Sequence, residues 1–194
     1  MTGKHHNLRQ VLAALLTLLA LIVLVGLVPV SEEEAADKIP QGYVLGPEPG
    51  EDYSEYARVA NNSLREAGVS EVFGLVVFNQ PLSPQQVDEL VPAGWGRVNA
   101  IIATGTQPLD TPEPVPGASR ADVIERTLDN AAAGHADLTA PRTLDAIVAY
   151  APGEKLRTLA ENPGASEFIK SVELAPPDAV WGHLGIRVPN SPDR

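Results

Sequence analysis

The feature that most constrains this chain is an uncharged, apolar stretch near its start. No acidic or basic residue occurs between Arg9 and Glu32, and Val11–Val28 has the sequence VLAALLTLLALIVLVGLV. As a helix, this stretch is about 27 Å long at roughly 1.5 Å per residue, which is close to the hydrocarbon thickness of a bilayer. The sequence therefore predicts a transmembrane helix over residues 11–30.

The charges on either side of this stretch predict its orientation. Lys4 and Arg9 precede it, and Glu32–Glu34 follow it. Because positive charge is retained on the cytoplasmic side, residues 1–10 are expected in the cytoplasm and the rest of the chain outside. The prediction is a single-pass signal anchor in the cell membrane.

Two alternatives to an uncleaved anchor stay open. A cleaved signal peptide would yield a secreted protein, but its apolar region usually spans about 7–15 residues and ends at a small-x-small site. The exits available here, LVG, PVS and EEA, match such a site poorly. The second alternative is a helix buried in a soluble core.

Charge and cysteine content exclude several functions. After residue 30 the chain carries 12 basic residues against 25 acidic ones, so a nucleic-acid partner is not expected. The chain has no cysteine, which excludes disulfides, thiolate nucleophiles and cysteine-bound zinc. A composition rich in Ala, Val, Leu, Pro and Arg, with few Lys, is typical of a high-GC bacterial genome.

The remainder divides into three parts. Residues 31–50 combine an acidic run with Pro and Gly, which predicts a linker. Residues 51–175 contain alternating helical and strand patterns and form the predicted extracytoplasmic domain. Residues 176–194 are rich in Pro, Gly and Asp and are expected to form an irregular tail.

Hydrophobic periodicity gives the elements of the predicted domain. Helices are expected at 52–67, 83–91, 119–133 and 153–160, and strands at 72–78, 98–103, 144–150 and 168–174. At the first strand-to-helix junction, Ser83, Pro84 and Gln86 form the pattern of a capping box with proline at the first helical position. The proline-rich segment 104–117 is expected to be an extended loop.

The order helix, strand, helix, strand occurs twice, which suggests an internal repeat. VFGLVVF at 72–78 aligns with LDAIVAY at 144–150, and Arg58 and Asn62 align with Arg126 and Asn130. Two interleaved right-handed βαβ units predict an α+β domain of ferredoxin-like topology, with the extra helices over an edge or the open face. An open, parallel α/β sheet is the alternative.

One segment resembles a known family. Leu156–Glu173, LRTLAENPGASEFIKSVE, is similar to the end of the subtilisin propeptide and inhibitor family, with an inward-facing helix, an Asn-Pro turn and a strand that ends in Val-Glu. That resemblance implies a ferredoxin-like fold. The overall organisation, a basic start, one apolar segment and an acidic body, resembles single-pass bacterial membrane proteins.

Signatures of catalysis and of cofactor binding are missing from the sequence. The loop after Phe78 has two prolines and no glycine, so it does not suit a phosphate cradle. His5 and His6 lie before the apolar stretch, and His135 and His183 lack ligand-spaced partners. We therefore predict no catalytic, cofactor-binding or metal-binding residues.

A few polar and aromatic residues have two interpretations each. Arg58 and Arg126 form either a pseudo-symmetric site for an anion or structural contacts between elements. Glu32–Glu34 with Asp37 either attract Ca²⁺ or form a solvated flank of the membrane segment. Trp95 and Trp181 are exposed binding aromatics or, as we favour, lids over the core.

These observations predict a non-enzymatic, membrane-anchored interaction or assembly module of the bacterial cell envelope with an envelope protein as partner. The alternative is an extracytoplasmic enzyme or small-ligand sensor with a site near Arg58, Arg126 and His183.

Overall fold

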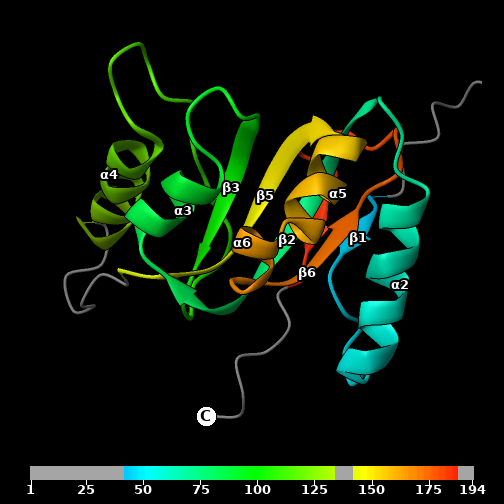
Figure 1. The fold of residues 1–194 in the computed structure, drawn as a ribbon. Coiled ribbons are helices and arrows are strands. Elements are labelled where there is room, and N and C mark those ends of the chain that lie inside the picture. Colours follow the sequence, from blue (N-terminus) through cyan, green and yellow to red (C-terminus); the bar gives the residue numbers. More distant parts are fainter. Residues whose placement is uncertain (1–41, 134–141, 188–194) are drawn as a thin grey trace, which may run out of the picture. The chain divides into compact units, whose positions relative to one another are not determined.

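The computed structural model describes residues 42–133 and 142–187, and residues 1–41, 134–141 and 188–194 lie outside the description (Figure 1). The predicted anchor at 11–30, His5, His6, the acidic run Glu32–Glu34 and His135 therefore fall outside the described residues. The described elements are β1 (Val44–Leu45), α2 (Tyr53–Arg65), β2 (Glu71–Leu82), α3 (Pro84–Leu90), β3 (Arg97–Ala103), β4 (Leu109–Asp110), α4 (Arg120–Ala133), β5 (Leu144–Pro152), α5 (Gly153–Glu161), α6 (Pro163–Ser166), β6 (Ile169–Leu174) and β7 (Gly185–Ile186).

The described residues form a mixed α+β unit around an antiparallel sheet. Five strands pair in the order β4-β3-β5-β2-β6, and every neighbouring pair is antiparallel. The crossover from β2 through α3 to β3 skips one strand position, which β5 fills, and the crossover from β5 through α5 and α6 to β6 skips the position of β2. Two βαβ units thus interleave, and the alternative of an open parallel sheet is wrong.

The side chains of the interior strand β2 alternate between two apolar faces of the sheet. Val72, Val76 and Phe78 point to the helices, whereas Phe73, Leu75 and Val77 point to the opposite side. Because both faces are covered, the strand reads as a nearly continuous apolar run. Gly74 lies on the helical face, where an added Cβ would come within 3.1 Å of Leu156 in α5, so glycine lets the helix pack closely.

All four longer helices contribute to the core on one face of the sheet. Their buried residues Leu64, Val87, Val91, Ile124, Leu128, Leu156 and Leu159 pack with the strands in one cluster. The start of α3 confirms the predicted capping box: Ser83 Oγ accepts a hydrogen bond from the Gln86 N–H, and Gln86 Oε1 accepts one from the Ser83 N–H at 2.9 Å. This cap fixes the direction in which α3 leaves β2.

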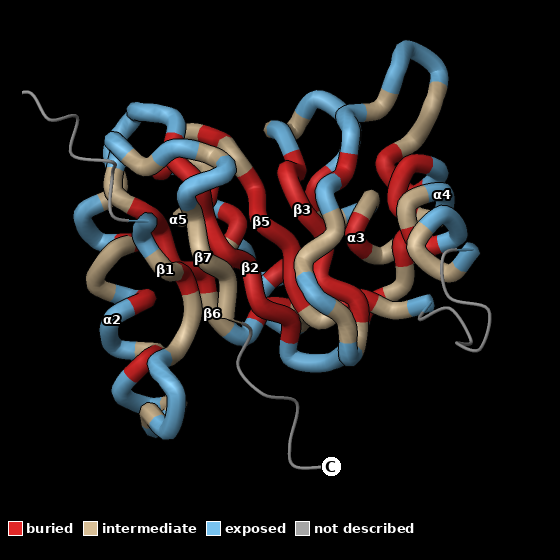
Figure 2. The backbone as a smooth tube through the Cα atoms, turned by 180° about the vertical axis from the view of Figure 1, so that it is seen from behind, coloured by how far each residue is buried: buried red, intermediate tan, exposed pale blue. Residues whose placement is uncertain are grey.

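The opposite face is covered by the two ends of the described chain. The pair β1 and β7 lies on the side of the sheet away from α3 and α5 (Figures 1 and 2). Leu45 is fully buried there, and Trp181 packs on Phe73 with ring centroids 5.6 Å apart. Parts of the predicted linker and of the predicted irregular tail therefore belong to the folded unit, because their few apolar residues close this face.

One glycine makes this closure possible. Gly46 has φ of 99°, a left-handed conformation that side chains rarely adopt, and a Cβ there would collide with the carbonyl oxygen of Arg187. The parallel pairing of Val44 with Gly185 depends on this close approach.

The extra helices cover the two ends of the sheet. On one side α2 packs along β6, where Tyr53 Oη donates to the Lys170 carbonyl at 3.1 Å and Ser63 Oγ accepts from the Leu174 N–H at 2.9 Å. On the other side α4 packs against α3 and β4.

Several predicted boundaries need correction. Strand β2 continues to Leu82, because Asn79 stays hydrogen-bonded to the segment before β6. The proline-rich segment contains β4, and the predicted turn at Asn162 contains the short helix α6. Helix α2 ends at Arg65, two residues before the predicted end at residue 67.

No helix within residues 42–133 and 142–187 is both long and apolar enough to cross a membrane. The predicted membrane span lies outside these ranges.

Candidate functional site

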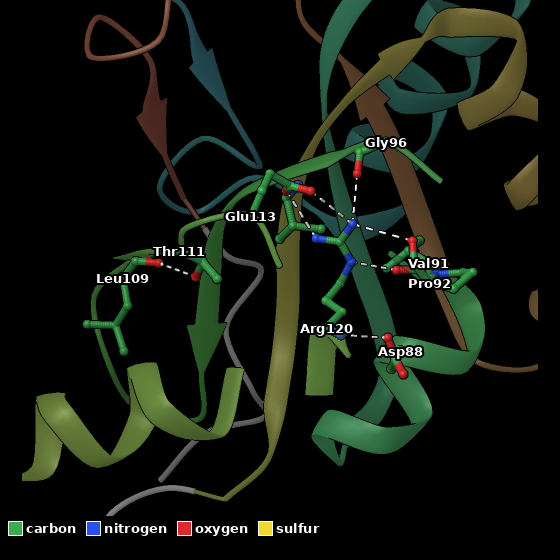
Figure 3. Close-up of polar contacts among 9 residues, drawn as sticks. Asp88, Val91, Pro92, Gly96, Leu109, Thr111, Glu113 and Arg120 are labelled. Atoms are coloured by element: carbon green, nitrogen blue, oxygen red, sulfur yellow. Dashed lines mark hydrogen bonds and ion pairs between the residues drawn. The ribbon is translucent and has the colours of Figure 1, made fainter. Parts of the chain in front are cut away.

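The most completely buried charged side chain belongs to Arg120, at the start of α4. Its guanidinium donates from Nε to the Val91 carbonyl at 2.6 Å, from Nη2 to the Gly96 carbonyl at 2.8 Å, and from Nη1 to Glu113 Oε1 at 3.1 Å (Figure 3). Its backbone N–H donates to Asp88 Oδ1 at 2.9 Å. These contacts join α3, the turn before β3, the proline-rich segment and α4.

This arrangement is structural in character. Glu113 Oε1 also accepts the Val98 N–H at 2.8 Å, so the carboxylate holds both the buried arginine and the start of β3. A guanidinium whose donors meet fixed acceptors has little capacity left for a ligand. Sequence reasoning missed Arg120; the available signal was a lone basic residue at the start of a helix, directly before the apolar positions Ala121, Val123 and Ile124.

A second buried polar cluster lies where β6 meets α2 and β1. Glu173 is 3% exposed and accepts the Gly46 N–H at 2.7 Å. Burial raises the pKa of this carboxyl group above its usual range. The pKa of the neighbouring Tyr56 is raised by burial and by the charge of Glu173, and no hydrogen-bond partner of its hydroxyl is present in the described part of the chain.

Two open grooves flank α5 on the helical face. The first, which we call the arginine groove, lies between α2 and α5 and has a volume of about 730 Å³. It is defined by Arg58, Asn61, Asn62 and Arg65 of α2 and by Arg157 and Glu161 of α5. Leu64, Ala57 and Ala160 form its apolar part.

The second groove, which we call the aromatic groove, lies between α3 and the α5–α6 segment and has a volume of about 570 Å³. It is defined by Leu90, Trp95, Lys155, Thr158, Asn162 and Phe168. Lys155 Nζ lies 5.3 Å from the centroid of the Trp95 ring, within the range of a cation–π contact. Leu90, Trp95 and Phe168 are each half-buried, so the groove presents apolar surface to solvent.

The structure does not bring the three alternative site residues together. Arg58 is exposed on α2, beside the β6 edge, and its guanidinium lies 3.9 Å from Glu55. Arg126 is exposed on α4, at the opposite end of the sheet. His183 is exposed in the loop before β7. Among the described residues, the ion pair of Arg58 is with Glu55 of its own helix, and no hydrogen bond or ion pair joins Arg126 to another element. Trp95 and Trp181 both pack over core clusters, as predicted.

The junction between β2 and α3 uses its polar groups within the fold. Asn79 Nδ2 donates to the Glu167 carbonyl at 3.1 Å, and Ser83 caps α3. Among residues 42–133 and 142–187, no group of three or more His, Cys, Asp or Glu side chains is placed to hold a metal ion.

Comparisons with protein-family models, with curated proteins and with solved structures give no match.

Proposed function

We propose that this protein is a single-pass membrane protein of the bacterial cell envelope whose folded unit is an extracytoplasmic interaction or assembly module. The module holds its partner on the helical layer, with α5 as the central contact. The single observation that carries this proposal is that open grooves flank α5 on both sides, one lined by arginines and one by aromatic side chains. Arginine and aromatic residues are enriched among the residues that contribute most to binding at protein interfaces.

The sheet edges suit a partner less well. Tyr53 and Ser63 of α2 occupy backbone groups of β6 at one edge. At the other edge, β4 has two residues and continues into a segment that contains Pro112, Pro114 and Pro116. Short, proline-flanked or covered edges disfavour the addition of a strand from another chain.

Photo-crosslinking tests the docking face. A photoreactive amino acid replaces Thr158, which is exposed on α5 in the aromatic groove, in the full-length protein in its native membranes. The matched control replaces Asn130, exposed on α4. We expect one discrete crosslinked partner from position 158 and none from position 130; equal crosslinking from both positions, or none from either, would contradict the proposal.

The uncharged segment 11–30 and its flanking charges support the location of the folded unit outside the cytoplasmic membrane. Reporter fusions at residue 40 test this location. A reporter active outside the cytoplasmic membrane is expected, and one active only in the cytoplasm would overturn it. If the chain found in membrane fractions begins after residue 25, the apolar segment is a cleaved signal peptide and not an anchor.

We further propose that the sheet is a ferredoxin-like arrangement extended by β4, and that it arose by duplication of a helix–strand–helix–strand unit. The interleaved crossovers and the related positions of α2 and α4 support this proposal. The enzyme or sensor alternative has less support, because the structure does not bring together Arg58 on α2, Arg126 on α4 and His183 in the loop before β7.

A further inference from the structure

We propose that the arginine groove binds an acidic peptide segment of the partner, with the peptide carboxylates on the guanidinium groups and an apolar peptide side chain against the groove floor. This inference rests on the docking role proposed above for the helical layer around α5.

Positive charge is concentrated in the arginine groove. The described residues contain ten Lys and Arg against nineteen Asp and Glu, so most of the surface is acidic. Three of those ten cations, Arg58, Arg65 and Arg157, line one groove, whose lining contains a single carboxylate, Glu161. A local positive groove in an acidic body attracts anionic groups selectively to that place.

The three guanidinium groups of the groove keep most of their positive charge available to a ligand. Arg157 Nη1 donates to the Ala67 carbonyl at 3.1 Å, and Arg65 Nη2 donates to the Asn62 side-chain oxygen. Both acceptors are neutral, so these contacts orient the guanidinium planes without cancelling their charge. Within the described ranges, the only ion pair of the groove joins Arg58 to Glu55, at 3.9 Å between exposed side chains. Carboxylates fit such planar donors well, often with two parallel hydrogen bonds.

The apolar residues of the groove favour a peptide over other anions. The apolar part of the groove lining, which we call its floor, consists of Leu64, Ala57 and Ala160. A free phosphate ion or a lipid headgroup gains nothing from such a floor, whereas a peptide that alternates acidic and apolar residues covers both. An anionic membrane surface would also face the acidic body as a whole, which carries an excess of acidic residues around the groove.

Titration of the full-length protein, in a nonionic detergent, with a labelled peptide tests this inference. The peptide alternates glutamate and leucine, and its control carries glutamine in place of glutamate. We expect saturable, salt-sensitive binding of the glutamate peptide. The double substitution Arg58→Gln and Arg65→Gln should weaken it roughly three- to tenfold, since exposed ion pairs contribute modestly.

The control is Arg126→Gln, which removes one positive charge from an exposed helical position on α4, against two removed by the double substitution, and should leave the affinity unchanged. Melting temperatures of all variants show whether folding is preserved. If Arg126→Gln weakens binding as much, per charge removed, as the double substitution in the groove, the attraction is general electrostatics and the inference is wrong. Tighter binding of inorganic phosphate or of phosphatidylglycerol vesicles, or no saturable peptide binding, would also overturn it.

The two proposals fail separately. A partner captured at Thr158 together with peptide binding that ignores the groove arginines would end the acidic-peptide inference and leave the docking face in place. No capture at Thr158 would end the docking proposal itself.

Discussion

Two charged side chains, Arg120 and Glu173, are almost completely buried, and the fold compensates the cost of burying their charges to different extents. Arg120 meets three backbone carbonyls and a carboxylate, so its charge is matched by hydrogen bonds and by an ion pair. Glu173 accepts one backbone N–H and faces the hydroxyl of Tyr56, so burial outweighs its stabilisation as an anion. Arg120 is therefore expected to stabilise the fold at all ordinary pH values, and Glu173 to make stability depend on pH.

Arg120→Met should lower the free energy of unfolding by about 3–5 kcal/mol, because it leaves Glu113 and several buried carbonyl groups without their partner. The measurement is urea unfolding followed by circular dichroism. Arg126→Met, in the same helix but exposed, should change stability by no more than about 0.5 kcal/mol. Equal effects of the two substitutions would show that the Arg120 contacts do not stabilise the fold.

Glu173→Gln should stabilise the protein at neutral pH and leave it unchanged in acid. An acid whose pKa is raised in the folded state binds its proton more tightly there than in the unfolded chain. The free energy of unfolding of the wild type therefore decreases as the pH rises from the ordinary carboxyl pKa, about 4.3, through the raised folded value.

Gln imitates the protonated carboxyl group at every pH, so the two melting temperatures should coincide below the ordinary carboxyl pKa. Above that pH the two melting temperatures should diverge, and the melting temperature of Glu173→Gln should be the higher one. A wild type that is more stable than the variant at neutral pH would mean that the carboxylate, despite its burial, is favoured by its surroundings.

At the level of elements, local sequence signals predicted the long helices and central strands, and tertiary contacts decided the short elements. The strands near 72–78 and 144–150 and the Ser83 cap follow from side-chain patterns alone. Strands β1, β4 and β7 have two residues each, too few for any periodicity, and exist because a partner strand aligns their backbone groups. Helix α6 is a single turn of four residues, which is also too short for a periodic pattern, so the sequence predicts only a turn there.

Ser83→Ala should lower the free energy of unfolding by about 1 kcal/mol, because the first turn of α3 loses its side-chain acceptor. Ser83→Asp keeps an acceptor and should retain most of the stability. Urea unfolding of the three proteins measures both effects. If the alanine variant matched the wild type, α3 would be positioned by packing of Val87 and Val91 rather than by its cap.

At the level of the whole molecule, the antiparallel sheet with helices on one face could be predicted, but the site could not. The predicted internal repeat aligns Arg58 with Arg126, whereas the fold places these two residues at opposite ends of the sheet. The arginine groove instead joins Arg58 and Arg65 to Arg157, which lies about ninety residues further on in another helix. Only the packing of α2 beside α5 reveals this grouping, because no local pattern records it.

Single-cysteine labelling in intact cells tests the central claim most directly, since the chain has no cysteine of its own. Thr158→Cys and Asn130→Cys variants react with a maleimide that does not cross the cytoplasmic membrane. The account predicts that both label in intact cells, and that position 158 labels more slowly in cells than in purified protein while position 130 does not. Labelling only after lysis, or equal protection of both positions, would contradict it.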